Sequence, residues 1–430
     1  MHELTNKTQS LEVDTICFKM NKTIKALVPY KTMEVIMADL FKTLKRINTD
    51  SIKWAMAKEE TGSEETLAFS VADSDYETAP EIKDALMSRV EHGAFGYARA
   101  DASYYEVVKD WMQRRYDIDI DVKPIIPIPK VLTAISRLIQ TLSEKEDAIV
   151  LQTPVYHAFR PVIEDNERVI VDNPLIKDAT THRYIMDLGH LEETFKKGAK
   201  MMILCSPHNP VGRVWTYHEI RDLVKLCKAY DVPLISDEIH SDIIMDSSDF
   251  TSTARFFDIY EKIAVLNAPS KTFNIAGLQS GNMIIQNEAL RKKVSKALKA
   301  IHMSMPNILS MKALKAAYTE CDYWVDAQNT HIKTNFEMMK KTLESTFNDI
   351  KITPLEGTYL AWLDIGFTGL TSSDFKKRLA EEKQMVVAKG VKFKDGTNTH
   401  IRLNLACSES MLKEGLKRLT DFITEIQKEA

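Results

Sequence analysis

Four side chains that could act together in chemistry each follow a short apolar stretch of the sequence: Tyr156, Asn209, Asp237 and Lys271. A lysine amine can form an imine with an aldehyde. A carboxylate can keep a ring nitrogen protonated, an amide can donate to a phenolic oxygen, and a tyrosine ring can stack on a flat ligand. Together, these groups have the chemistry needed to hold an aromatic aldehyde.

Each of the four residues also has an ordinary structural explanation. Lys271, taken alone, is more readily explained as a solvated loop lysine. Asp237 at a strand end is more often a helix cap or turn residue, Asn209 in HNPVG is a normal turn residue, and Tyr156 commonly packs in a core. Their joint occurrence meets the needs of pyridoxal 5'-phosphate (PLP), whose pyridine ring serves as an electron sink. We therefore interpret the set as a candidate PLP site.

The elements that must position these residues are short apolar strands separated by helices. Strands that are apolar throughout are typical of a mainly parallel sheet with helices on both faces. In such sheets ligands sit beyond the carboxyl ends of the strands, where all four residues fall. Residues 216–230 predict one of the helices, with Thr216 as its N-cap. The strand candidates are 147–152, 168–172, 200–206, 232–236, 262–267 and 282–286.

The spacing within DEIH adds a geometric expectation for the site. Side chains alternate between the two faces of a strand, so Asp237 and Ile239 would point the same way. With Asp237 against a ring nitrogen, Ile239 would lie behind the ring, opposite Tyr156. The sequence thus predicts a ring held between Ile239 and Tyr156.

The second half of the chain predicts a smaller α+β domain. A long helical region runs from about residue 309 through Lys341 and is followed by strand candidates at 358–365, 385–389 and 400–406. The first fifty or so residues are polar, Lys-rich and weakly periodic. We expect an N-terminal arm over 1–76 that partly joins the small domain, a large α/β domain over 77–316 and the small domain over 317–430.

Composition excludes several classes of protein. The chain has 430 residues, 44% of them hydrophobic and 27% charged, which is typical of a globular protein. A net charge of -4 argues against a nucleic-acid partner, and the sequence has neither an apolar run long enough to span a membrane nor the apolar core of a signal peptide. Five scattered cysteines without CxxC spacing favour reduced thiols and a cytoplasmic location. His208, Asp237, Glu238 and His240 match no standard metal spacing, so we expect no metal site.

Several blocks resemble a known family. HNPVG (208–212), SDEIH (236–240) and SKTFNIAGL (270–278) are similar to the signature blocks of fold-type I PLP enzymes, the class I and II aminotransferase family. TPVYHAF (153–159) and HGAFGY (92–97) further resemble its C–S lyase subfamily, which includes cystathionine β-lyases. The resemblance runs from about residue 47 to the C-terminus. It implies a large domain with a mainly parallel sheet between helices and a smaller C-terminal α+β domain.

The resemblance also implies roles for the four strand-end residues. Lys271 matches the Schiff-base lysine that is also the general acid and base, and Asp237 matches the partner of the pyridinium nitrogen. Asn209 matches the donor to the phenolic oxygen. Tyr156 matches the aromatic side chain that stacks on the ring, and we count it with Lys271 among the catalytic candidates.

Further residues are assigned to the cofactor and the substrate by the same comparison. Ser270 is similar to a hydroxyl that holds the phosphate, and Ile239 and His240 complete the cofactor-binding block. Arg402 in HIRLNLA matches the arginine that grips the substrate α-carboxylate, although a surface strand arginine is the plainer explanation. Tyr97 matches a tyrosine that reaches the partner's site, which implies a homodimer with shared sites.

The sequence departs from the family pattern at several places, two of which concern the phosphate. The stretch PIPKVLTAI (127–135) matches the phosphate-binding loop, and it places Lys130 where a small residue is usual, followed by Val131. We expect Lys130 either to contact the phosphate or to crowd it. Gln279 stands where aminotransferases commonly have a phosphate-binding arginine. The C–S lyase branch often lacks that arginine too, so this departure favours a lyase.

Three functions therefore compete. The first is a PLP-dependent β-lyase that cleaves L-cystathionine or a related cysteine conjugate to thiol, pyruvate and ammonia. The second is an aminotransferase of an L-amino acid on the same cofactor. The third is a PLP-binding regulatory protein that has lost turnover.

Overall fold

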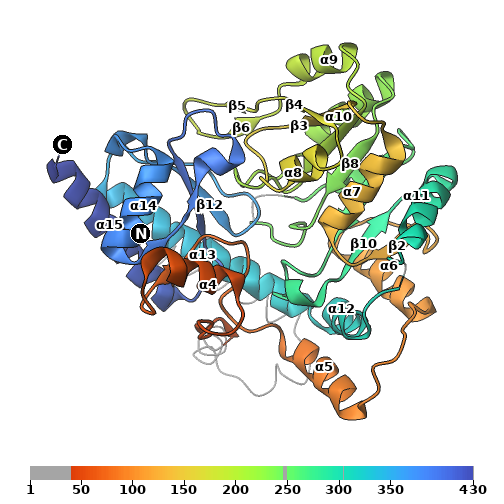
Figure 1. Ribbon diagram of the computed structural model, residues 1–430, viewed down its shortest axis with the longest axis horizontal. Coiled ribbons are helices and arrows are strands. Elements are labelled where there is room, and N and C mark those ends of the chain that lie inside the picture. The colour runs from red at the N-terminus through yellow and green to blue at the C-terminus, as the bar shows by residue number, and fades with distance from the viewer. Residues whose placement is uncertain (1–39, 246–248, 304, 430) are drawn as a thin grey trace, which may run out of the picture.

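The protein is described by a computed structural model over residues 40–245, 249–303 and 305–429 (Figure 1). Most of the predicted polar arm, residues 1–39, lies outside these ranges. The described chain forms a larger body around one sheet and a smaller body near the C-terminus, and α13 (Asp322–Thr346) runs between them (Figure 1). The fold is the α/β arrangement that the sequence predicts.

A seven-stranded mixed sheet is the centre of the larger body. All six predicted strands are present in it, and β2 is added at one edge. The β9–β8–β7–β3–β4 neighbours pair in parallel, whereas β10 is antiparallel to both β2 and β9. In spatial order the strands are β2 (Ile125–Ile128), β10 (Gly281–Ile284), β9 (Ile263–Asn267), β8 (Leu234–Asp237), β7 (Met201–Cys205), β3 (Ala148–Leu151) and β4 (Val169–Asp172).

Helices cover both faces of this sheet, and strand alternation divides its side chains between two apolar cores. On β7, Met201, Ile203 and Cys205 belong to one core, and Met202 and Leu204 belong to the other. The first core is closed by α7 (Val131–Leu142), α8 (Phe159–Glu164) and α11 (Glu288–Ala300). The second is closed by α6 (Ala102–Tyr116), α9 (Leu188–Lys196), α10 (Tyr217–Ala229) and α12 (Ile308–Glu320).

The helix predicted at 216–230 is α10, and its first turn explains where it begins. Thr216 accepts a hydrogen bond from the backbone N–H of Glu219, and the Glu219 carboxylate accepts one from the backbone N–H of Thr216. This capping box satisfies two backbone donors that a helix N-terminus would otherwise leave unpaired. The helix then buries Ile220, Leu223 and Val224 against the sheet.

The smaller body is an antiparallel sheet with the strand order β11–β12–β15–β14. The strand predicted over 385–389 is two strands in the structure, because the chain changes partners at Val387. β13 (Met385–Val386) pairs in parallel with β1 (Leu67–Ala68), and β14 (Ala388–Lys389) pairs with β15. The other elements here are β11 (Lys351–Ile352), β12 (Leu360–Asp364), β15 (His400–Asn404), α14 (Ser372–Lys383) and α15 (Glu409–Glu429).

The long helical region predicted after residue 309 is interrupted once. It consists of α12 and α13, which meet at Cys321. Two helices, α4 (Ile52–Thr61) and α5 (Pro80–His92), precede the strands of the large sheet in the sequence. The remaining short elements are β5 (Ile176–Lys177), β6 (Tyr184–Ile185), and the 3-10 helices η1 (Thr253–Phe256), η2 (Ala276–Leu278), η3 (Gly366–Thr368) and η4 (Gly390–Phe393). None of the helices in the described part of the chain has the length and apolarity to cross a membrane.

Candidate active site

The carboxyl ends of four neighbouring parallel strands lie at one edge of the large sheet. Cys205 at the end of β7 pairs with Asp237 at the end of β8, and Asp237 pairs in turn with Leu266 of β9. Leu151 of β3 pairs with Ile203 of β7. The loops that carry the four predicted residues therefore start side by side, as the sequence predicts for a site at this edge.

Lys271 and Asp237 lie close enough in this edge for each to influence the charge of the other. Asp237 is buried, and burial raises the pKa of its carboxyl group to about 7, opposed by the backbone N–H of Ile239 and by the Lys271 charge. Burial also lowers the pKa of the Lys271 amine. The amine donates a hydrogen bond to the backbone oxygen of Ala72 at 2.7 Å. An amine of lowered pKa next to a buried acid is the arrangement expected at a reactive centre.

Arg402 comes to this edge from the smaller body. Its Nη1 donates to the side-chain oxygen of Asn209 at 2.9 Å, and its Nη2 donates to the backbone oxygen of Ser70 at 2.7 Å. The guanidinium lies over the ring of Phe393, 4.7 Å from its centroid. Arg402 is 3% exposed, so it is not a surface arginine, and burial lowers its pKa to about 10.

Tyr156 lies at the same place, half-buried against the core beneath α7 and α8. Burial and then the Asp237 carboxylate raise the pKa of its hydroxyl group, whereas Arg402 opposes the rise. The structure therefore brings Tyr156, Asn209, Asp237, Lys271 and Arg402 together; we call these five residues the Lys271 cluster.

Ile239 and His240 follow Asp237 in a turn rather than in the strand. β8 ends at Asp237, so the expectation that strand alternation aims Asp237 and Ile239 the same way rested on a wrong premise. The cause is local: the Asp237 carboxylate accepts the Ile239 N–H and turns the chain. His240 is buried with its ring edge against Tyr359, and burial followed by the Lys271 and Arg402 charges lowers its pKa well below the usual value.

The loop that carries Lys271 is held by residues that the sequence did not single out. Ser270 is buried and accepts the Ile275 N–H through its backbone oxygen. Thr272 donates to the buried carboxylate of Asp242 at 2.8 Å, and Trp111 donates to the same carboxylate at 3.2 Å. Asp242 thus fixes the loop at Thr272, the residue after Lys271. In the sequence it is one of three acids in DEIHSD, and nothing there distinguishes its role.

A second group that the sequence did not reveal is a strap over the site, residues 70–76. Its backbone oxygens accept hydrogen bonds from Lys271, Arg402, Asn274 and Asn404. The strap is thereby tied to both sheets and supplies the acceptors nearest to the two cationic side chains of the Lys271 cluster. Periodicity in the sequence gives no sign of contacts made through backbone carbonyl groups.

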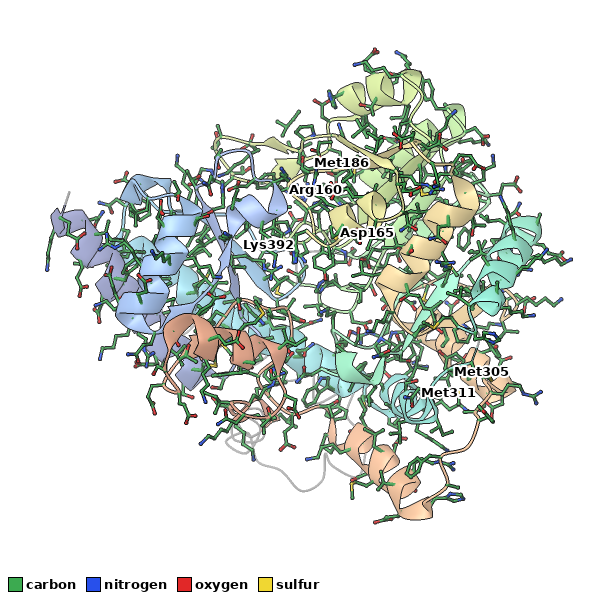
Figure 2. The ribbon with its side chains drawn as sticks, viewed as in Figure 1. Arg160, Asp165, Met186, Met305, Met311 and Lys392 are labelled. Carbon is green, nitrogen blue, oxygen red and sulfur yellow. The ribbon has the colours of Figure 1, made fainter. Side chains whose placement is uncertain are left out.

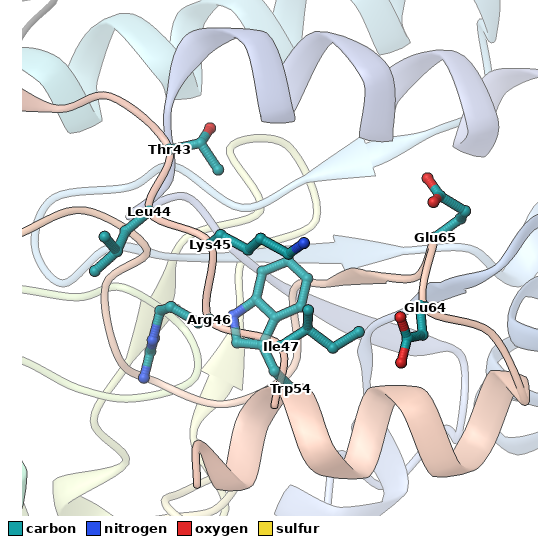
Figure 3. Close-up of a pocket in the computed structure, with 8 residues that line it drawn as sticks. All are labelled: Thr43, Leu44, Lys45, Arg46, Ile47, Trp54, Glu64 and Glu65. Atoms are coloured by element: carbon teal, nitrogen blue, oxygen red, sulfur yellow. The ribbon is translucent and has the colours of Figure 1, made fainter. Parts of the chain in front are cut away.

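The strap is anchored from its far side by a buried ion pair. Asp75 accepts hydrogen bonds from Lys53 Nζ at 2.5 Å, from Trp54 Nε1 at 2.8 Å and from Arg46 at 3.1 Å. Lys53 and Asp75 are both buried. Arg46 and Trp54 also line a hollow of about 350 Å³ whose opposite rim carries Glu64 (Figure 3). No member of the Lys271 cluster lines that hollow.

The remaining predicted residues lie outside the Lys271 cluster. Val131 is the first, buried residue of α7, and Lys130 is the exposed N-cap residue, whose side chain does not cap the helix. Tyr97 is 99% exposed in this single chain. It lines a hollow of about 590 Å³ together with Pro129, Gln279 and Met305. No three metal-ligating side chains are grouped anywhere in the described ranges.

Comparison with known proteins places the chain in a family. The sequence profile of the family "Aminotransferase class I and II" matches residues 64–419. The chain belongs to this family. It is 35% identical over 377 residues to the cystathionine β-lyase PatB of Bacillus subtilis (strain 168), covering 87% of this chain and 97% of that relative.

Solved structures of the family agree with the fold. Cystalysin from Treponema denticola, described as containing a pyridoxal 5'-phosphate cofactor, is 31% identical with a TM-score of 0.87, over 90% of this chain and 99% of that chain. A PLP-bound C–S lyase from Staphylococcus hominis is 27% identical with a TM-score of 0.84, over 92% and 99% of the two chains. The chain therefore has the fold-type I architecture that its signature blocks resemble.

Proposed function

We propose that this protein is a PLP-dependent carbon–sulfur β-lyase that converts L-cystathionine or a related cysteine conjugate to thiol, pyruvate and ammonia. The observation that carries the proposal is the meeting of the Lys271 amine, the buried Asp237 carboxylate and the Arg402 guanidinium at one sheet edge. Its relatives support the choice of reaction, since the cystathionine β-lyase PatB is similar to it over almost its whole length.

The residues at the sheet edge fit PLP. The Asp237 carboxylate accepts one backbone N–H, and its burial disfavours an isolated negative charge. A protonated ring nitrogen is therefore a suitable partner for it. The amine of Lys271 contacts only neutral backbone among its hydrogen-bond partners in the described chain. The Nε atom of Arg402 is buried and has no hydrogen-bond partner within the described residues. Beyond the bonds that Arg402 makes to Asn209 and Ser70 and that Lys271 makes to Ala72, these two cationic groups keep donor capacity for a ligand.

In this proposal each member of the Lys271 cluster has one task. Lys271 would hold the cofactor covalently through its amine, Asp237 would keep the ring nitrogen protonated, Asn209 would donate to the phenolic oxygen and Tyr156 would stack on the ring. When bound, PLP supplies an electron sink for the pair left behind when a substrate loses its α-proton. Ile239 and His240, in the turn after Asp237, would complete the cofactor-binding block.

The phosphate-binding end is assigned to the start of α7 and the loop before Lys271. Helix N-termini offer unpaired backbone N–H groups to an anion, and α7 begins at Val131 without a side-chain cap. Ser270 adds a hydroxyl, and the exposed Lys130 adds a positive charge that contacts the phosphate rather than filling its place. This choice between the two expectations for Lys130 rests on its outward position.

The substrate is held and deprotonated by two cationic side chains. Arg402 binds the α-carboxylate through its planar guanidinium, which matches a carboxylate in two parallel hydrogen bonds. The Lys271 amine, whose pKa is lowered by burial, would be freed when the substrate's amino group takes its place, and it would then accept the α-proton. The Cβ–S bond then breaks, sulfur leaves as the thiol, and the remaining three-carbon unit is hydrolysed to pyruvate and ammonia.

We also propose a homodimer in which Tyr97 reaches the partner's site. Phe95, Tyr97, Met87, Val90 and Met305 are exposed apolar side chains on α5, on the stretch after it and before α12 (Figure 2 labels Met305). A group of this kind is expected to be covered by another protein surface. Four described cysteines are buried free thiols, which supports the proposed cytoplasmic location.

Product identity tests the proposed function against an aminotransferase. A lyase releases pyruvate and thiol from L-cystathionine without any added keto acid. An aminotransferase releases no thiol and requires a keto acid to complete its cycle. Production of thiol at the same rate with and without keto acid supports the lyase, whereas keto-acid-dependent turnover without thiol contradicts it. A protein that binds PLP but converts no amino acid would favour the regulatory role.

A further inference from the structure

A second cationic side chain lies beside Arg402 at the boundary between the two bodies. Lys392 belongs to η4, and Figure 2 shows it on the side of the smaller body that faces the larger one. The Arg402 guanidinium lies over the ring of the next residue, Phe393, 4.7 Å from the ring centroid. The Phe393 backbone oxygen accepts the N–H of Val155 at 3.1 Å. Lys392 therefore directly precedes, in the chain, the residue whose ring packs against Arg402.

His157 faces the same place from the larger body. It follows Tyr156, whose ring centroid is 5.1 Å away, and its own ring stands edge-on to Phe393 at 5.5 Å. Burial, followed by the charges of Lys392 and Arg402, lowers its pKa to about 4. His157 is thus a neutral side chain, and its Nδ1 atom is buried without a hydrogen-bond partner.

The charge of Lys392 is not balanced by the protein. Within the described part of the chain, it forms no ion pair. Besides burial, the charges of Arg402, Lys376 and Lys389 lower its pKa, and the Glu60 carboxylate opposes this change. That carboxylate is already paired with Lys376 at 2.7 Å. An exposed cation surrounded by cations is a place that attracts an anion.

We propose that Lys392 and His157 form a subsite for a carboxylate at the far end of the substrate's thioether arm. The substrate class is then cysteine conjugates that carry an acidic group beyond sulfur, in preference to neutral S-alkyl cysteines. The inference rests on the proposed function and deepens it. Arg402 takes the α-carboxylate, Lys392 supplies charge for the second carboxylate, and His157 supplies an N–H donor.

The backbone of η4 is shaped to hold Lys392 in this position. A Cβ atom at Gly390 would come within 2.4 Å of the backbone oxygen of His400. The N–H of Val391 donates to the Ser372 hydroxyl at 3.3 Å. The turn that precedes Lys392 is therefore packed closely against β15, the strand that carries Arg402. This packing fixes the backbone of Lys392 relative to the backbone of Arg402.

The test compares two substrates of nearly equal shape that differ in one charge. S-(2-carboxyethyl)-L-cysteine ends in a carboxylate, and S-(2-carbamoylethyl)-L-cysteine ends in the neutral amide. Pyruvate formation by the PLP-loaded enzyme gives kcat/KM for each. The wild-type protein is expected to prefer the acid by about 5- to 10-fold, the range of a partly exposed charge pair supported by a neutral donor.

Variants assign the preference to Lys392. Lys392→Met should remove it, lowering kcat/KM for the acid by about 5- to 10-fold and for the amide by less than about 2-fold, and Lys392→Glu should reverse it. The matched control is Lys417→Met, which removes the same charge from an exposed position of α15. An equal fall in kcat/KM for both substrates would mean that Lys392 does not recognise the second carboxylate. No fall for either substrate would exclude the subsite. Both results overturn the proposal.

Binding of uncleavable carbon analogues separates this inference from the proposed function. L-2-aminopimelate and L-2-aminoheptanoate lack sulfur, and calorimetry on the PLP-loaded protein gives their dissociation constants. Tighter binding of the diacid that is lost in Lys392→Met supports the subsite even if no thioether yields pyruvate, in which case the lyase assignment alone fails. Equal binding of the two analogues by wild type overturns the subsite even if the lyase assignment holds.

Discussion

Arg402 donates a hydrogen bond to the side chain of Asn209 at 2.9 Å, although the two residues are 193 positions apart in the chain. Asn209 follows a central strand of the large sheet, and Arg402 lies on β15 of the small one. The bond joins the two bodies at the place where the proposed cofactor and substrate meet. The position of one body relative to the other is therefore part of the site, and changes at this contact should affect substrate binding first.

Arg402→Lys tests the carboxylate grip. Lysine keeps the charge but cannot donate two parallel hydrogen bonds from a planar group. We expect kcat/KM for L-cystathionine to fall by about 100-fold, on the order of 3 kcal/mol, with most of the change in KM. Steady-state pyruvate formation measures both constants. A variant with unchanged KM would show that another residue binds the α-carboxylate.

Asp237→Asn tests the buried acid in the PLP-free protein. The pKa of Asp237 is raised to about 7 when folded, against about 3.9 in an unfolded chain. Between these values the folded protein holds a proton that the unfolded chain releases, so the free energy of unfolding falls as pH rises from about 4 through 7. The total effect is up to about 4 kcal/mol, and the Asn variant should lack it.

Urea unfolding at a series of pH values measures this difference. The Asn variant should gain stability relative to wild type as pH rises from 4 to 8, since amide and carboxyl groups have similar size. Titrating groups distant from Asp237 contribute equally to both curves and cancel in the difference. Parallel curves over the whole range would mean that Asp237 is not held in a setting that raises its pKa.

Lys53 and Asp75 test the anchor of the strap. Lys53→Met leaves the buried Asp75 without its 2.5 Å partner, and breaking a buried pair typically costs about 3–5 kcal/mol. The double variant Lys53→Met/Asp75→Asn removes both charges and should recover a large part of that loss. Chemical denaturation of the four proteins completes the cycle. Simple additivity of the two single losses would contradict a direct interaction.

Tyr97 tests the proposed dimer through complementation. Tyr97→Ala and Lys271→Ala should each lose activity if one site needs both residues from different chains. Refolding the two variants together in equal amounts should restore about a quarter of the wild-type sites, since half of the dimers are mixed and each has one complete site. Each variant refolded alone is the control. A mixture no more active than its components would contradict the shared site.

Much of the large sheet could be predicted from the sequence because its strands are apolar throughout and end in polar residues. KMMILC and KIAVLN are examples, and β7 and β9 are buried along their whole length. The juxtaposition of Asn209, Asp237 and Lys271 follows from one rule, that parallel strands end at the same edge. The signature blocks then supplied the family, which the matched profile confirms.

What could not be predicted depends on contacts between distant segments. The strap over residues 70–76 binds Lys271 and Arg402 through backbone oxygens, which any sequence offers equally. The split of 385–389 into β13 and β14 depends on which strand lies beside each half. Strand alternation does not apply to Ile239, because the Asp237 carboxylate accepts the Ile239 N–H where the strand ends, a local contact that apolar patterning does not reveal.

The central claim is that the Lys271 amine holds PLP, and reduction followed by peptide mapping tests it most directly. Borohydride treatment of the PLP-loaded protein converts a carbon–nitrogen double bond to a stable single bond, and mass spectrometry of the digest locates the attached cofactor. The account predicts the cofactor on the peptide that contains Lys271, and no stable attachment in Lys271→Ala. Attachment at another lysine in wild type, or equal attachment in the variant, would contradict it.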